Sequence, residues 1–214
     1  MKQIRILSIG DDSLRVAMSY LPKIAKCDSV SIVSGILYNE ELTAESMLQK
    51  IRSDSEDFTF VYNNEGSVRF NTIENFSVSK AFDWFDWDYV VIPQQNNCSD
   101  YACIQDLCCC IRDISPKTSI VINIDDVKNN TSGADSVLTF FVSDVSADAE
   151  KEIAESGYIA DVYSGRVKDF LSACVLYEML TGNNVAKNKY RLPFVESEIT
   201  EIIKNVVHRY YAKG

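Results

Sequence analysis

The architecture of this chain follows from one segment, Ile4-Arg5-Ile6-Leu7-Ser8-Ile9-Gly10-Asp11-Asp12-Ser13-Leu14. It begins as an apolar run typical of a buried strand, and Gly10 permits a tight backbone turn where that run ends. Beyond the turn, apolar residues recur at helical spacing between Val16 and Ala25. The pattern therefore predicts a strand over 3–9 and a helix over roughly 13–26.

The turn between these two elements is a candidate site. In open parallel sheets, ligands bind at the carboxyl ends of the strands. Acidic and hydroxyl side chains at such a turn are also ordinary caps of a helix N-terminus, and both interpretations fit this stretch. The residues concerned are Gly10, Asp11, Asp12 and Ser13.

The rest of the chain alternates between strand and helix patterns. Apolar runs predict strands over 30–37, 89–92, 119–124 and 137–142. Helical patterns occupy 43–52, 77–82, 99–112, 146–156, 166–180 and 196–211. This order predicts an α/β fold, a three-layer sandwich in which helices cover both faces of a parallel sheet of about five strands.

One part of the chain departs from this rhythm. Residues 58–62 alternate in polarity, 63–66 form a turn signal, and 68–70 alternate again. The pattern predicts a β-hairpin, which we expect as an insertion over 57–71 on the surface of the domain.

We expect one domain over 1–182, followed by a linker and helix over 183–214. The last helix carries a broad apolar stripe from Ile199 to Tyr210. That stripe is expected to pack on the domain itself or on a second copy of the chain as a homodimer contact.

Composition excludes several classes of function. The chain has 214 residues and a formal net charge of −10, which argues against a nucleic-acid binder and against docking on an anionic membrane. No stretch is apolar for the length of a membrane span, and the first apolar run is too short for a signal peptide. We therefore expect a soluble, cytoplasmic protein.

The seven cysteines also favour a reducing compartment. Their number is odd and 108–110 are adjacent, which suits no disulfide framework. No CxxC pair accompanies them, so free thiols are expected and no zinc site. We predict no metal and no cofactor, although carboxylates from Asp11, Asp12 and Asp125 offer a conceivable Mg²⁺ site.

Three aromatic residues precede the strand predicted over 89–92. Trp84, Phe85 and Trp87 fit the core and rim of the sheet, and exposure near Gln94 would instead indicate a stacking platform for a sugar or peptide.

Several short motifs follow one another in a distinctive order. They are Ile9-Gly10-Asp11-Asp12-Ser13, Ala17-Met18-Ser19-Tyr20-Leu21, Ile36-Leu37-Tyr38, Trp87-Asp88-Tyr89-Val90-Val91-Ile92-Pro93-Gln94-Gln95, Ser156-Gly157-Tyr158-Ile159, Gly165-Arg166 and Leu180-Thr181-Gly182. In this order they resemble the SGNH (GDSL-type) hydrolase superfamily, specifically a branch of unknown function. The resemblance implies a flavodoxin-like α/β fold. It also implies a reaction in which a serine attacks an ester carbonyl while a histidine, oriented by an aspartate, acts as base.

The resemblance can be carried over residue by residue. Without a gap, the nucleophile position falls on Asp12, and with a one-residue insertion it falls on Ser13. The triad aspartate falls on Ser156, and the histidine falls on Ile159, which cannot take a proton. The sole histidine, His208, stands on the last predicted helix, where it is expected at the surface or, alternatively, folded back onto Ser13.

The oxyanion-hole positions are altered as well. The family's glycine pair falls on Glu40 and Glu41, whose carboxylates would oppose a developing negative charge, while Gln94 keeps a family-like role. The resemblance places the following residues around the pocket: Gly10, Asp11, Asp12, Ser13, Glu40, Glu41, Gln94, Ser156, Tyr158 and Ile159.

These replacements favour an SGNH-like protein that has lost hydrolytic activity and keeps a binding or interaction role toward a small molecule or a protein. The alternative is a residual or altered esterase for small or carbohydrate esters. In that alternative Ser13 is the nucleophile, and Asp12 and Gln94 are the other catalytic candidates.

Overall fold

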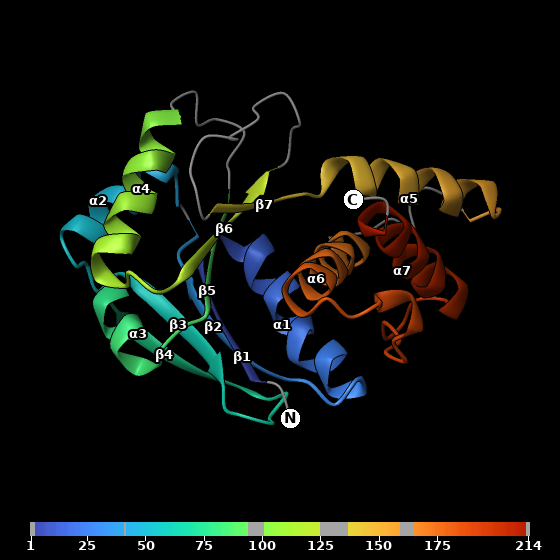
Figure 1. Ribbon diagram of the computed structural model, residues 1–214, viewed down its shortest axis with the longest axis horizontal. Helices are drawn as coiled ribbons and strands as arrows, with labels where there is room; N and C mark the ends of the chain where they lie inside the picture. Colours follow the sequence, from blue (N-terminus) through green and yellow to red (C-terminus); the bar gives the residue numbers. More distant parts are fainter. Residues whose placement is uncertain (1–2, 41, 94–100, 125–136, 159–164, 213–214) are drawn as a thin grey trace.

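The computed structural model describes residues 3–40, 42–93, 101–124, 137–158 and 165–212, and within these ranges the chain has an α/β fold (Figure 1). The described strands form a seven-stranded sheet in the order β4-β3-β2-β1-β5-β6-β7. They are β1 (Gln3–Gly10), β2 (Ser31–Tyr38), β3 (Phe58–Asn63), β4 (Phe70–Phe76), β5 (Tyr89–Pro93), β6 (Ser119–Ile124) and β7 (Val137–Phe141). The first strand lies at the centre, parallel to both of its neighbours, β2 and β5.

The sheet is mixed, which corrects the prediction of a purely parallel sheet of about five strands. β3 pairs antiparallel with β2, and β4 pairs antiparallel with β3. The hairpin therefore extends the edge of the central sheet and is not a surface insertion over 57–71. The reason lies in the alternating apolar residues of the hairpin. Phe58 and Phe60 point to the same face of β3, are 1% and 0% exposed, and are buried in the core between the sheet and its helices.

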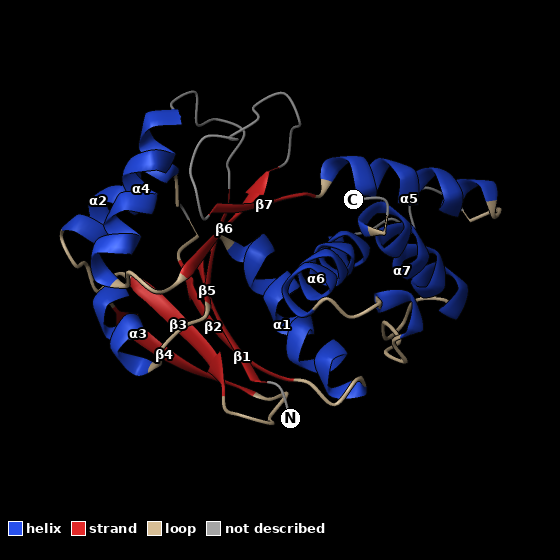
Figure 2. Ribbon diagram, viewed as in Figure 1, coloured by secondary structure: helices blue, strands red, loops and turns tan. Residues whose placement is uncertain are grey.

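Helices cover both faces of the sheet, so the molecule has three layers (Figure 2). On one face, α1 (Asp12–Cys27) packs against α6 (Gly165–Thr181), and α5 (Ser143–Glu155) and α7 (Ser197–Tyr211) extend that layer. On the other face lie α2 (Ala44–Arg52), α3 (Val78–Trp84) and α4 (Tyr101–Ile114). None of the helices in the described ranges has the length and apolar content needed to cross a bilayer.

Alternate residues of β1 supply the two cores. Ile4 and Ile6 contribute to the core beneath α1 and α6, whereas Leu7 and Ile9 contribute to the core beneath α2, α3 and α4. A central strand that is apolar on both sides is typical of a sheet covered on both faces.

The last helix, α7, packs on α5 and α6 of its own chain. Its apolar stripe is covered there, since Ile199, Ile203 and Val207 are all 0% exposed. Lys204 is buried with them, and its Nζ donates to the carbonyl of Asn188 at 2.5 Å. A buried ammonium held in this way fixes the helix against the 3₁₀ turn Val185–Lys187.

The three aromatic residues before β5 take different environments. Trp87 is buried, and its indole N–H donates to the carbonyl of Ala81 at 2.7 Å. Phe85 packs edge-on against Trp87, while Trp84 is 42% exposed and contacts the ring of Phe60 edge-on. Trp87 is thus a core residue, and Trp84 covers the rim of an aromatic cluster.

The cysteines that the structure describes are free thiols in different environments. Cys27 and Cys109 are exposed, whereas Cys103, Cys108 and Cys174 are buried. Burial raises the pKa of the Cys108 and Cys174 thiols, which keeps them protonated and unreactive.

Candidate functional site

The carboxyl end of β1 leads directly into α1. The Gly10 carbonyl accepts a hydrogen bond from the backbone N–H of Asn39 at 3.3 Å, which ties the end of β1 to the end of β2. The Asp11 carboxylate accepts from the backbone N–H of Leu14 at 3.4 Å and so satisfies one of the free amides of the first helical turn. Asp11 therefore acts as a helix cap in this structure.

Asp12 and Arg15 form an ion pair on the exposed side of that turn. Their side chains lie 2.5 Å apart, and the guanidinium also lies over the ring of Tyr38, 5.1 Å from its centroid. The hydrogen bond that Arg15 donates to Asp12 is the main reason that the pKa of Arg15 is raised. Tyr38 ends β2, so these contacts join the ends of two neighbouring strands through α1.

A third carboxylate reaches this region from a distant part of the sequence. Asp169, in the second turn of α6, is half-buried, and its pKa is raised to about 6. Burial is the largest cause, followed by the negative charges of Asp12 and Asp11. Sequence reasoning missed Asp169, because nothing in the local pattern of α6 marks it as a neighbour of the first turn of α1.

Asp169 reaches this position because α6 runs in the same direction as α1. The ring of Phe170 packs edge-on against Tyr20 at 5.9 Å, and the Tyr177 hydroxyl donates to Asp28, just beyond the end of α1, at 2.5 Å. The start of α6 therefore lies beside the start of α1, and the end of α6 lies at the opposite edge of the sheet.

His208 is engaged at that opposite end. Its Nδ1 lies 2.6 Å from Oε1 of Glu178, and its Nε2 lies 2.8 Å from the side-chain nitrogen of Asn184. Glu178 is nine residues after Asp169 on the same helix, which is about 14 Å along the axis at 1.5 Å per residue. Glu178 Oε2 also accepts from the backbone N–H of Val185 at 3.0 Å. Both ring nitrogens of His208 thus have partners within the contact between α6 and α7, away from the first turn of α1.

Two further sequence-predicted residues lie apart from the strand end. The Ser156 hydroxyl donates to the Glu152 carbonyl at 2.9 Å, and the Tyr158 hydroxyl donates to Glu198 of α7 at 3.0 Å. Both follow the end of α5, which Figure 1 shows well away from the start of α1.

The remaining candidates are placed only in part. Glu40 is exposed and follows the end of β2, and Ser13 belongs to the first turn of α1. The candidates outside the described residues are Glu41, Gln94, Asp125 and Ile159. Among the described residues, no group of three or more His, Cys, Asp or Glu side chains is arranged to hold a metal ion.

The comparisons with known proteins show a similarity of fold. No protein-family model matches the chain, and no curated protein sequence matches it. Among solved structures, it is similar to the crystal structure of a DUF4886 family protein from Bacteroides uniformis ATCC 8492, with a TM-score of 0.79 and 17% sequence identity. The similarity covers 99% of this chain and 95% of that chain, so the two share the whole fold.

Proposed function

We propose that this chain is an SGNH-hydrolase-like protein that does not hydrolyse esters and that uses the carboxyl end of β1 to bind a ligand or partner. One observation carries the proposal. The chain has a single histidine, and His208 is held by Glu178 and Asn184 near the end of α6, whereas the start of α6 brings Asp169 to the turn after β1.

The groups at the turn after β1 are poorly suited to ester hydrolysis. A serine nucleophile needs a neighbouring base and hydrogen-bond donors for the oxyanion. At the turn after β1, the described ionisable groups include three carboxylates, Asp11, Asp12 and Asp169, and Asp12 forms an ion pair with Arg15. Such a cluster opposes the negative charge that develops on an attacked carbonyl oxygen.

The same charges favour a basic ligand. An ammonium or guanidinium group placed near Asp169 would relieve the repulsion that it experiences from Asp11 and Asp12. We therefore propose a small amine, or a basic side chain of a partner protein, as the ligand class. Because the pKa of Asp169 is about 6, binding should strengthen as the pH rises from about 5 to about 7.5 and this carboxyl ionises.

The binding test uses a panel of small amines, with chemical shifts of backbone amides as the readout. Asp169→Asn should weaken binding of the amines, whereas Asp113→Asn, which removes an exposed carboxylate on α4, should not. Equal effects of the two substitutions would contradict binding at this edge.

Hydrolysis is tested separately with short p-nitrophenyl esters and a fluorophosphonate probe. We expect no turnover that depends on Ser13 and no covalent adduct on its hydroxyl. Turnover that disappears in Ser13→Ala, together with labelling of Ser13, would establish the second candidate function, a residual esterase for small or carbohydrate esters.

One observation favours that second candidate. A carboxyl group with a pKa of about 6 is suited to act as a general base near neutral pH, and Asp169 has this property at the turn that contains Ser13. If the protein is an esterase, Asp169→Asn must abolish the Ser13-dependent turnover.

A further inference from the structure

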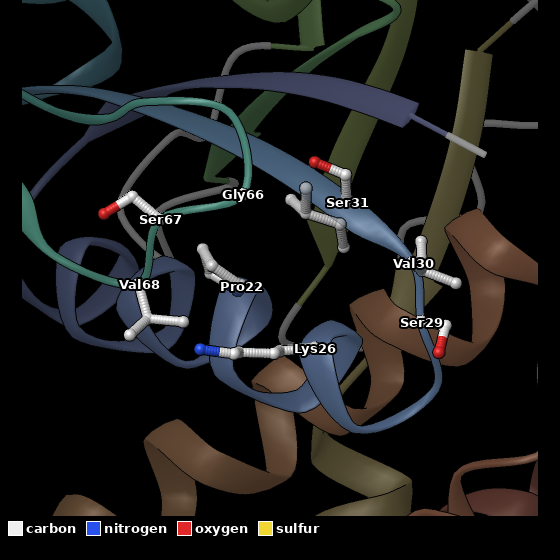
Figure 3. Close-up of a pocket in the computed structure, with 9 residues that line it drawn as sticks. Pro22, Lys26, Ser29, Val30, Ser31, Gly66, Ser67 and Val68 are labelled. Atoms are coloured by element: carbon white, nitrogen blue, oxygen red, sulfur yellow. The ribbon is translucent and has the colours of Figure 1, made fainter. Parts of the chain in front are cut away.

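A hollow lies at the opposite end of the strands from the site after β1, close to the amino end of β2. Its volume is about 180 Å³, and it opens between the last turns of α1, the start of β2 and the turn that joins β3 to β4 (Figure 3). The residues that line it are Pro22, Lys26, Ser29, Val30, Ser31, Ile32, Gly66, Ser67 and Val68. None of them belongs to the site at the carboxyl end of β1.

The outer wall of this pocket is held in place by a buried side chain. Asn63 is 0% exposed, and its Oδ1 accepts from the backbone N–H of Ser34 at 2.6 Å. Its Nδ2 donates to the carbonyls of Ile32 at 3.0 Å and Ser67 at 2.6 Å. The side chain of Asn63, the last residue of β3, thus hydrogen-bonds to β2 where the backbone pairing of the two strands ends, and it also holds the hairpin turn. Gly66, with φ of +70°, provides the backbone conformation that closes this turn.

The pocket lining is mainly apolar and includes the side chain of Lys26. Pro22, Val30, Ile32 and Val68 provide hydrocarbon surface. In Figure 3 the Lys26 side chain extends across the pocket toward Val68. Lys26 forms no ion pair with any residue of the described ranges, although the chain as a whole carries a formal charge of −10.

We propose that this pocket binds a small carboxylate with a compact apolar body, of the size of benzoate. The volume supports the size, because an apolar cavity of about 150 Å³ accommodates a benzene ring. The hydrocarbon lining takes the ring, and the ammonium of Lys26 takes the carboxylate at the mouth. A neutral molecule of the same shape gains only the first of these contacts.

The test is a titration of the full chain with sodium benzoate, followed by backbone amide chemical shifts, with benzyl alcohol as the neutral analogue. We expect saturable shifts at residues 29–32 and 66–68, with a Kd on the order of 1 mM for benzoate. Benzyl alcohol should bind about threefold to fivefold more weakly.

Two variants and a matched control complete the design. Lys26→Met should weaken benzoate binding by about threefold to fivefold and leave benzyl alcohol binding unchanged. Lys151→Met, which removes an exposed lysine on α5, should change neither. Val68→Trp should fill the pocket and abolish binding of both molecules, with the native amide spectrum showing that the fold is intact.

The proposal is overturned if about 20 mM benzoate leaves the amides of 29–32 and 66–68 unshifted, since that concentration exceeds the expected Kd many times. It is equally overturned if the two lysine variants weaken benzoate binding to the same extent. Because the pocket and the carboxyl end of β1 share no residue, these results are independent of the amine-binding and esterase tests.

Discussion

Replacing Asp169 by asparagine should stabilise the protein at neutral pH, and the effect should disappear in acid. The pKa of Asp169 is raised from the ordinary value of 3.8 to about 6, mainly by burial and then by Asp12 and Asp11. A carboxyl whose pKa is higher in the folded state binds more protons when folded, so the folded state loses stability as the pH rises through about 4 to 6. Above that window the ionised carboxylate opposes folding in full.

The magnitude follows from the two pKa values. The difference between 3.8 and about 6 corresponds to about 3 kcal/mol at 1.36 kcal/mol per pH unit. Asp169 is only half-buried, so solvent screening reduces this contribution to about 1 kcal/mol. Asparagine has almost the same shape and carries no charge, so Asp169→Asn should recover about that amount at pH 7.5.

Urea denaturation of the wild type and Asp169→Asn at a series of pH values measures this difference. We expect the variant to be about 1 kcal/mol more stable at pH 7.5 and equal to the wild type near pH 4. Asp113→Asn, at an exposed position on α4, serves as the control and should show no such trend. A variant no more stable than the wild type at pH 7.5, or a gain that does not change with pH, would refute the idea that burial and the neighbouring carboxylates disfavour the ionised form of Asp169.

Two further predictions concern packing and thiol reactivity. Gly35→Ala should destabilise the protein by about 1–3 kcal/mol, because a Cβ there would lie 2.5 Å from the indole of Trp87. Gly165→Ala, where no atom in the described part of the chain lies within 4 Å of the added carbon, is the control, and equal losses in thermal or urea unfolding would contradict this packing. Cys109 is exposed and should react with a thiol reagent in the native protein, whereas Cys174 should react only after unfolding. Peptide mapping distinguishes the two, and rapid native labelling of Cys174 would be inconsistent with its burial.

The candidate site was predictable only where it is local in sequence. The apolar run before Gly10 and the helical spacing after it place a turn at a strand end, and the structure has β1 and α1 there. The capping role of Asp11 is likewise a property of neighbouring residues. Asp169 could not be predicted, because it reaches the turn only through the packing of α6 beside α1.

The position of His208 depends on the same packing. From the sequence, a terminal helix is free to lie at the surface, against a second copy or over the site. Contacts with Glu178 and Asn184 fix the imidazole near the end of α6, and buried Ile203 and Val207 hold the helix there. The histidine's distance from β1 is therefore a property of the packed layer and not of any motif.

Periodicity by itself predicted most of the strands and helices of this chain, because the two backbones repeat at different intervals along the sequence. The hairpin shows the limit of that information. Its alternation predicted a second strand over 68–70, whereas β4 spans Phe70–Phe76. Whether the two strands extend the sheet also depends on which surface is available to cover Phe58 and Phe60. Only the tertiary structure decided sheet order, the neighbours of Asp169 and the partners of His208, since each arises from contacts between elements that are distant in the chain.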